Sequence, residues 1–295
     1  MKLHGAEIAD TFAEAFPMWG SRVLITAATP AWALEAGRSM TGFATSVIGC
    51  KCEASIEREL AGDETPDGRP GVSALLFAMD REGVGKRLVE RVGQCVLTSP
   101  TAACFNGVDA EDTVDVGGQL RFFGDGYQAS KVLDGQRFWR VPVMEGEFLV
   151  QERFGVVKGV AGGNIIMLGR DAESALQAAE AAASAMRSVE GVIMPFPGGI
   201  ARSGSKVGSR YSALPASTND VLCPTLRGQI EHTDVPSDVE AVFEIVIDGL
   251  ALEPVREAMR RGLVAAAKAG ASHVTAGNYG GKLGPHHIYL RELMP

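Results

Sequence analysis

The sequence predicts an α+β fold of two ferredoxin-like (split βαβ) lobes in tandem, with an inserted β region between them. The arrangement strand, helix, strand occurs four times, at residues 22–48, 72–98, 164–195 and 241–275. In each copy a polar residue opens the helix. Two such units in series give β-α-β-β-α-β, so the four copies form two lobes, which we place at residues 1–150 and 151–295.

The helices of the first lobe have recognisable starts. The strand RVLITAA ends at a Thr29-Pro30 pair, a helix cap followed by a first-turn proline. The strand VSALLFAM ends at Asp80, a second cap. The segments FATSVIG and QCVLTS after the two helices are predicted to be strands. The second helix carries one apolar stripe at i, i+4 and i+8: Val84, Leu88 and Val92.

The second lobe repeats the pattern. Asp171 caps the helix after the strand NIIMLG, and EGVIMPF is predicted to follow that helix as a strand. AVFEIVI is the third strand, Asp248-Gly249 the turn, and SHVTAG the last strand. The core faces of the two helices are predicted to consist of Leu176, Ala179, Ala183 and Met186 in the first, and Val255, Met259, Leu263 and Ala266 in the second.

Two further stretches lie outside this pattern. Between the lobes, QLRFFG, QRFWRVPV and EFLVQ are predicted to be short strands of the inserted β region. Residues 198–238 are rich in Gly, Ser, Pro and Asn. A connection of that length inside a compact domain is usually functional.

The composition is that of a soluble globular protein. Hydrophobic residues make up 46% and charged residues 22% of the 295 residues. The net charge of −8 and the pI near 5.3 exclude nucleic acid and an anionic membrane surface as main partners. Acidic residues interrupt the N-terminal stretch, which predicts no signal peptide. Five scattered cysteines fit a reducing cytoplasm better than a disulfide framework.

Several familiar motifs nearly match and then fail. GNYGGKLG contains a Gly-Lys pair, but Ala276 replaces the first P-loop glycine and Leu283 replaces the Ser or Thr that binds magnesium. No GxGxxG follows a strand and no GxSxG occurs. Zinc ribbons bind the metal with two cysteine pairs, and the Cys50-Cys52 pair has no second pair to match it. The histidines also lack metal-ligand spacing, so we expect no metal site. Cys–His nucleophilic catalysis stays open, because nothing favours one pair.

The remaining polar features are six glycine-rich or polar loops. Each alone is typical of a tight turn, but together they could frame a cleft that binds a planar heterocycle through backbone groups. They are TPDGRPGV, FFGDGYQ, GVAGGN, FPGGI, GSKVGSRY and LPASTND.

These loops carry a resemblance to formylmethanofuran:tetrahydromethanopterin formyltransferases. The similarity covers nearly the whole chain, in order and with matching spacing. It includes EIADTFAEAF, TGFATSV, ETPDGRPGV, GQCVLTSPTA, FFGDGYQ, MEGEF, GVAGGN, PFPGGI, SKVGS, LPASTND and AGNYGGKLG. The family is described as two ferredoxin-like lobes, in agreement with the four-unit pattern. The segments ASIEREL and GVDAEDTVDVGG depart from it, and the net charge is mild beside that of methanogen members. Both departures favour a bacterial one-carbon oxidiser.

The resemblance implies a cytoplasmic acyltransferase of one-carbon metabolism. It would move a formyl group between the amine of methanofuran (or methylofuran) and N5 of tetrahydromethanopterin, two carrier substrates, with no permanently bound cofactor. A homodimer or homotetramer is implied, with formylmethanofuran hydrolase/dehydrogenase subunits as further partners. Two alternatives stay open: a scaffold subunit of a formylmethanofuran hydrolase complex with little activity alone, and a pterin-binding protein without transfer activity.

Glu244 is the catalytic candidate. It is the only ionisable group inside the apolar strand AVFEIVI, and alternation places it on the face of Val242 and Val246. From the strand alone, its carboxyl is either solvent-facing or buried for a purpose. The resemblance implies the second, because the corresponding glutamate of the family motif is thought to be the catalytic acid.

The candidate carrier-binding residues lie in the polar loops. Asn219 and Asp220 in PASTND, and Ser205 and Lys206 in GSKVG, carry groups suited to amide or pterin recognition, although capping and turn formation explain them equally. Further candidates, with the same alternative, are Tyr127, Gln128 and Arg69.

Overall fold

The computed structural model describes all residues, 1–295, and divides into two compact units. The first unit comprises Met1–Pro17 and Val160–Pro295, and the second comprises Met18–Gly159. The sequence-based division at residue 150 differs from this one by nine residues and by the N-terminal segment. That segment joins the C-terminal part because β2 (Ala6–Ile8) pairs with β17 (His273–Thr275).

The unit Met18–Gly159 is built on a four-stranded antiparallel arrangement in the order β6-β3-β5-β4. Along the chain its elements are β3 (Phe12–Thr26), α1 (Pro30–Thr41), α2 (Val47–Cys50), β4 (Glu53–Leu60), β5 (Gly71–Ala78), α3 (Arg81–Arg91) and β6 (Ala103–Asn106). The helices α1 and α3 bury Met40, Val84 and Leu88 against Val23, Ile25 and Leu76 of the strands.

The C-terminal unit repeats that strand order as β17-β12-β16-β13, again antiparallel throughout. Its elements are β12 (Val157–Gly169), α5 (Ala172–Met186), β13 (Val192–Ile193), β16 (Ala241–Gly249), α6 (Leu252–Lys268) and β17. At the outer edge, β2 lies parallel to β17, and β1 (Lys2–Leu3) pairs with β2. The fold is therefore mixed α and β, as expected.

Shorter elements complete the chain. The region after β6 contains β7 (Thr113–Asp115), α4 (Gly117–Leu120), β8 (Ala129–Leu133), β9 (Gln136–Val143), β10 (Gly146–Gln151) and β11 (Arg153–Gly155). The C-terminal unit adds β14 (Ser205–Val207), β15 (Ala216–Thr218) and β18 (His286–Tyr289). The 3-10 turns are Gly62–Glu64, Arg121–Gly124, Pro197–Gly199, Asp220–Leu222, Pro224–Leu226 and Leu290–Leu293.

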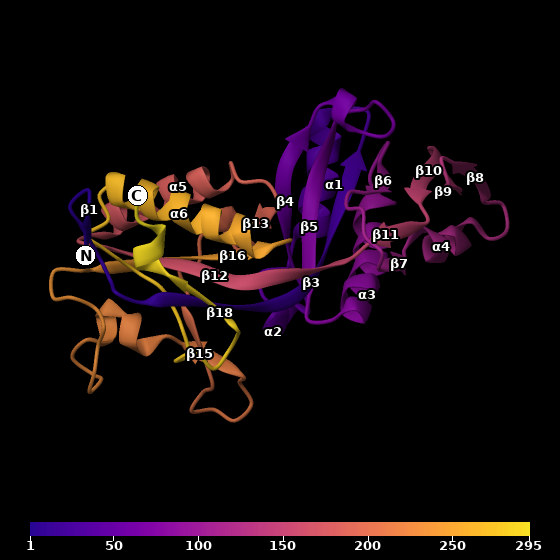
Figure 1. Cartoon of the computed structure of the whole chain (residues 1–295). Helices are drawn as coiled ribbons and strands as arrows, with labels where there is room; N and C mark the ends of the chain where they lie inside the picture. Colours follow the sequence, from indigo (N-terminus) through magenta and orange to yellow (C-terminus); the bar gives the residue numbers. More distant parts are fainter. The chain divides into compact units, whose positions relative to one another are not determined.

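The sheet of the C-terminal unit has two different faces. Figure 1 shows α5 and α6 on one side of β12 and β16, and the segment with β15 on the other. Ile165, Met167, Ile245 and Ile247 point to the helices and form the main core with them. The alternate residues Ile166 and Leu168 pack under the loop-rich segment instead, with Val235 and Val239. The second face is therefore covered by loops.

Three predicted helix caps, Thr29, Asp80 and Asp171, are confirmed. The fourth helix differs from the prediction: α6 follows Ala251 without a side-chain cap, and the predicted turn Asp248-Gly249 is the end of β16. The Thr29 hydroxyl accepts from the Trp32 N–H at 3.3 Å. Asp80 and Asp171 accept from the N–H groups three residues later, at 2.7 Å in both helices. Short polar side chains at these positions satisfy N–H groups that have no intrahelical partner, which is why the helix starts could be identified from the sequence.

Three predicted strands are wrong. In FATSVIG, Phe43 has a φ of +50° and Ser46 caps the short helix α2. In QCVLTS, the apolar stripe of α3 continues through Val92 and Val96, so the chain stays helical as a π-helical turn, Val92–Val96. QLRFFG is helical because the amides of residues 116–118 all donate to the Glu152 carbonyl and start a turn.

No helix of this structure combines the length and the apolar character that crossing a membrane would require.

One predicted core residue is also wrong, and it provides a matched stability test. Met186 on α5 is fully buried, whereas Leu176 on the same helix is 40% exposed. We expect Met186→Ala to lower the free energy of unfolding by about 2–5 kcal/mol, because it leaves a cavity in the core. Leu176→Ala should cost less than about 1 kcal/mol. Chemical denaturation measures both, and equal losses would contradict this assignment of the core face.

Candidate active site

Glu244 lies in the middle of β16, held on both sides by neighbouring backbone. Its Cα is in register with Ile166 of β12. On the other side, the N–H groups of Ala201 and Glu244 each donate to the other residue's carbonyl, at 2.8 and 2.9 Å. Because Ile245 and Ile247 point to the helices, Glu244 points to the loop-covered face, the face expected from alternation.

Glu244 is half-buried, and its carboxyl has no hydrogen-bond or ion-pair partner within the chain. Burial disfavours the charged form, and it raises the pKa of Glu244 from the ordinary 4.5 to about 7. A carboxyl with this pKa is largely protonated just below neutral pH. It is therefore able to donate a hydrogen bond or a proton.

Tyr279 is the neighbouring ionisable group. Its pKa is raised by burial first, and then by the negative charges of Glu244 and Glu14. The side chain nevertheless remains 41% exposed. Tyr279 therefore combines proximity to both carboxyls with access to solvent. Sequence reasoning missed it, because it lies after β17 in a glycine-rich loop and has no periodicity to identify it.

A cavity of about 720 Å³ lies on the same loop-covered face. Its floor includes Ile166, the cross-strand neighbour of Glu244, and Thr275, which is in register with Ile166 on β17. Asn219 and Leu222 line it from the loop segment. Polar and apolar groups thus converge next to the cross-strand row of Glu244, Ile166 and Thr275, which we call the Glu244 row.

Asn219 is the one predicted binding residue that lines this cavity. Asp220 and Lys206 form an ion pair with 2.5 Å between Oδ1 and Nζ. The Lys206 ammonium lowers the pKa of Asp220. Both line a second cavity, of about 700 Å³, between β14 and β15 and the following turns. Ser205 is exposed on β14, one residue before Lys206.

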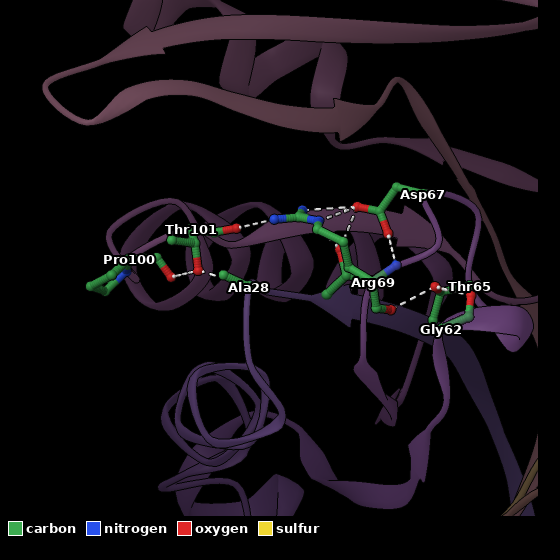
Figure 2. A network of polar contacts seen from close by, with 8 residues as sticks. Ala28, Gly62, Thr65, Asp67, Arg69, Pro100 and Thr101 are labelled. Carbon is green, nitrogen blue, oxygen red and sulfur yellow. Dashed lines mark hydrogen bonds and ion pairs between the residues drawn. The ribbon is translucent and has the colours of Figure 1, made fainter.

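The other three predicted residues belong to the unit Met18–Gly159. The Tyr127 side chain is 84% exposed, and the Gln128 Oε1 accepts from the Gly126 N–H at 2.9 Å. The guanidinium of Arg69 is held by protein groups: Nε donates to Asp67 at 2.8 Å, and Nη1 donates to the Thr101 carbonyl at 2.6 Å (Figure 2).

The network around Arg69 orders the loop between β4 and β5 against residues 100–101. Thr101 has a φ of +62°, a strained conformation for a β-branched residue. Its hydroxyl accepts from the Ala28 N–H at 3.0 Å and its carbonyl accepts from Arg69 (Figure 2). Arg69 thus has a positioning role in this unit, and carrier binding by Arg69 stays a prediction.

No cluster of three or more His, Cys, Asp or Glu side chains in the chain is arranged to hold a metal ion. The site chemistry that the chain itself provides is an uncharged carboxyl, a tyrosine and a polar cavity on one sheet face.

Comparisons with known proteins agree on one family. The sequence model described as "Formylmethanofuran-tetrahydromethanopterin formyltransferase" matches residues 1–143, and the one described as "FTR, proximal lobe" matches residues 146–293. A formylmethanofuran--tetrahydromethanopterin formyltransferase of Methylococcus capsulatus is 57% identical, with 100% of both chains covered.

Two solved structures have closely similar folds. The formylmethanofuran:tetrahydromethanopterin formyltransferase of Methanosarcina barkeri superposes with a TM-score of 0.94 at 50% identity, covering 99% of this chain and 100% of the other. A chain of the formyltransferase/hydrolase complex of Methylorubrum extorquens with methylofuran gives 0.96 at 50% identity, covering 99% and 98%.

The raised pKa of Glu244 predicts how the protein's stability depends on pH. The folded state holds this proton more tightly than the unfolded chain, so the stabilisation is complete below pH 4.5 and is lost as pH rises through about 7. Glu244→Gln removes the cost of a buried charge. We expect the variant to exceed the wild type by about 1 kcal/mol or more at pH 9, and to match it at pH 5.

Thermal unfolding of both proteins across this pH range measures the difference. A difference that is the same at pH 5 and pH 9 would show that Glu244 titrates as an ordinary exposed carboxyl.

Proposed function

The chain belongs to the formylmethanofuran–tetrahydromethanopterin formyltransferase family, and from that premise we propose how its residues carry out the reaction. It is an acyltransferase that moves a formyl group between a methanofuran-type amine and tetrahydromethanopterin in one-carbon metabolism. Both carriers act as substrates. The proposal concerns the residues, the lobes and the partners.

Each compact unit corresponds to one ferredoxin-like lobe in this proposal. The support is the strand order, β6-β3-β5-β4 in one unit and β17-β12-β16-β13 in the other, with a helix in each of the two crossovers. The division into residues 1–150 and 151–295 is supported by the two family matches, which meet between residues 143 and 146.

The reaction needs an oxyanion to be stabilised. The accepting amine attacks the formyl carbon, the carbonyl oxygen gains negative charge, and the donor nitrogen leaves with a proton as the carbonyl re-forms. A preorganised donor aimed at that oxygen lowers the barrier. Glu244 is the catalytic acid in this scheme: its protonated carboxyl donates to the oxyanion, as a neutral acid can when its environment raises its pKa.

The observation that carries this assignment is the environment of Glu244. A half-buried carboxyl without a partner in its own chain has its donor proton available for a ligand, and its pKa of about 7 keeps that proton bound below neutral pH. An exposed glutamate, or one paired with an arginine, would be ionised and would repel the developing charge.

The carriers bind around this carboxyl. Asn219 contributes an amide to the cavity beside the Glu244 row, which suits the donor and acceptor edge of a pterin. Asp220 and Lys206 line the second cavity, and Ser205 precedes Lys206 on β14. Tyr127, Gln128 and Arg69, which belong to the unit Met18–Gly159, stay proposed carrier-binding residues.

The chain also assembles with other subunits in this proposal. The Methylorubrum extorquens structure is a formyltransferase/hydrolase complex, which supports an association of this chain with formylmethanofuran hydrolase/dehydrogenase subunits. A homodimer or homotetramer is part of the same proposal. The alternative is that the chain is mainly a scaffold for such a complex. Turnover by the purified chain alone, with formyl-tetrahydromethanopterin and the furan carrier, separates the two.

The first prediction for this function concerns loss of the acid. Glu244→Gln keeps the size of the side chain but replaces an acidic O–H by a weaker amide donor, and Glu244→Ala removes the donor. We expect kcat to fall at least about 100-fold in both, the scale of losing one oxyanion donor. KM for either carrier should change much less. A steady-state assay in which Glu244→Gln turns over at the wild-type rate would reject the mechanism and favour carrier binding without transfer.

The second prediction concerns pH. Because the protonated form of Glu244 is the active one, kcat of the wild type should be constant well below pH 7. It should then fall towards tenfold per pH unit as pH rises above about 7. The residual activity of Glu244→Gln should lack this limb. If kcat of Glu244→Gln fell over the same pH range as that of the wild type, the titrating group would be a residue other than Glu244.

A further inference from the structure

The loop of residues 277–284, the GNYGGKLG segment, begins directly beside the Glu244 row. The side chain of Asn164 holds its first residue at both ends: Oδ1 accepts from the Gly277 N–H at 2.6 Å, and Nδ2 donates to the Gly277 carbonyl at 3.1 Å. A Cβ at Gly277 would lie 3.8 Å from Cδ1 of Ile166, the register partner of Glu244. The loop therefore starts on the face that carries the catalytic candidate.

The rest of the loop closes around the carboxylate of Glu14. Glu14 lies on β3 and is 1% exposed. Its Oε2 accepts from the N–H groups of Tyr279, at 2.7 Å, and Gly281, at 3.0 Å. Its Oε1 accepts from those of Leu283 and Gly284, the latter at 2.9 Å. Four backbone donors thus converge on one side chain.

The carboxylate is ionised in this arrangement. Burial by itself would raise the pKa of Glu14, but the four backbone N–H donors outweigh it and lower the pKa below its usual value. The other ionisable groups at this position are Tyr279 and Lys282 in the loop, and His287, which is in register with Glu14 on β18. Both Lys282 and His287 are exposed.

We propose that Glu14 is a positioning residue of the transfer reaction: its ionised carboxylate fixes the 277–284 loop and so holds Tyr279 beside Glu244. Tyr279 is the residue through which Glu14 acts, because its N–H is bound to Glu14 and its side chain lies within the electrostatic reach of Glu244. The inference rests on the proposed function, since it assumes that Glu244 is the catalytic acid.

The interaction depends on charge as well as on shape. An ionised carboxylate offers acceptor sites on both oxygens, which match donors on two sides. A glutamine of the same size offers one oxygen, and its NH₂ group would face two N–H donors. Glu14→Gln would therefore release half of the loop, and Tyr279 would move with it.

The test compares Glu14→Gln with the wild type and with Glu180→Gln, a matched change of an exposed glutamate on α5, on the opposite face of the sheet. We expect kcat of Glu14→Gln to fall about 10- to 100-fold, because a misplacement of about 1 Å costs up to about 100-fold. KM should stay within about threefold. Glu180→Gln should retain wild-type kcat and KM.

The pH profile separates positioning from a general loss of stability. With the loop displaced, Glu244 gains contact with water, which favours its charged form and lowers its pKa, so the falling limb of kcat should move to lower pH. A wild-type kcat and an unmoved limb in folded Glu14→Gln would overturn the inference. Should Glu244→Gln itself keep full activity, the proposed function fails; a loss in Glu244→Gln but not in Glu14→Gln rejects only the role of Glu14.

Hydrogen exchange of the wild type keeps the inference testable if Glu14→Gln does not fold. At pH 7 the amides of Tyr279, Gly281, Leu283 and Gly284 should exchange more slowly than those of the exposed residues 212–213. Equal exchange in the two loops would mean that Glu14 does not hold the segment, and the inference would be wrong.

Discussion

The site depends on one constraint: a carboxyl placed on a sheet face where nothing in the chain pairs with it. An ionised carboxylate is costly to bury, and in practice such a group keeps its proton. The helix-covered face of the sheet contains only apolar contacts around Ile245 and Ile247, so Glu244 could not be accommodated there. The loop-covered face accepts it because the cover is formed by polar turns and a cavity rather than by a second layer of helices.

Two glutamates with similar sequence settings reach opposite protonation states. Glu14 and Glu244 each lie inside an apolar strand; Glu14 is fully buried and Glu244 is half-buried. Four backbone N–H groups surround Glu14 and keep it charged, whereas Glu244 has no partner and keeps its proton up to about pH 7. Two titratable groups whose pKa values are shifted in opposite directions can take different roles in one active site. The charged one orders backbone, and the neutral one is available for chemistry.

Three helix starts could be predicted from the sequence, whereas the point where a helix ends could not. The caps Thr29, Asp80 and Asp171 act within three residues, so these three helix starts could be predicted. The ends could not: Val92 and Val96 extend the stripe of α3 at the same spacing, but the predicted strand QCVLTS was inferred from apolar content alone. β4 was missed for the opposite reason. It is an edge strand paired only with β5, and edge strands tolerate the charges of EASIEREL.

The catalytic candidate was found because its signal is local, whereas its surroundings are built by contacts over long sequence distances. Asn164 and Gly277 are 113 residues apart, and Glu14 and Tyr279 are 265 apart. The near-match of GNYGGKLG to a phosphate-binding loop has a physical basis. Glycine-rich turns point several N–H groups at one spot, and such a spot requires an anion. Phosphate is one solution, and a buried glutamate from another strand is a second. A failed P-loop pattern therefore gives reason to search the same chain for an isolated acidic residue in an apolar strand, and FAEAF contains one.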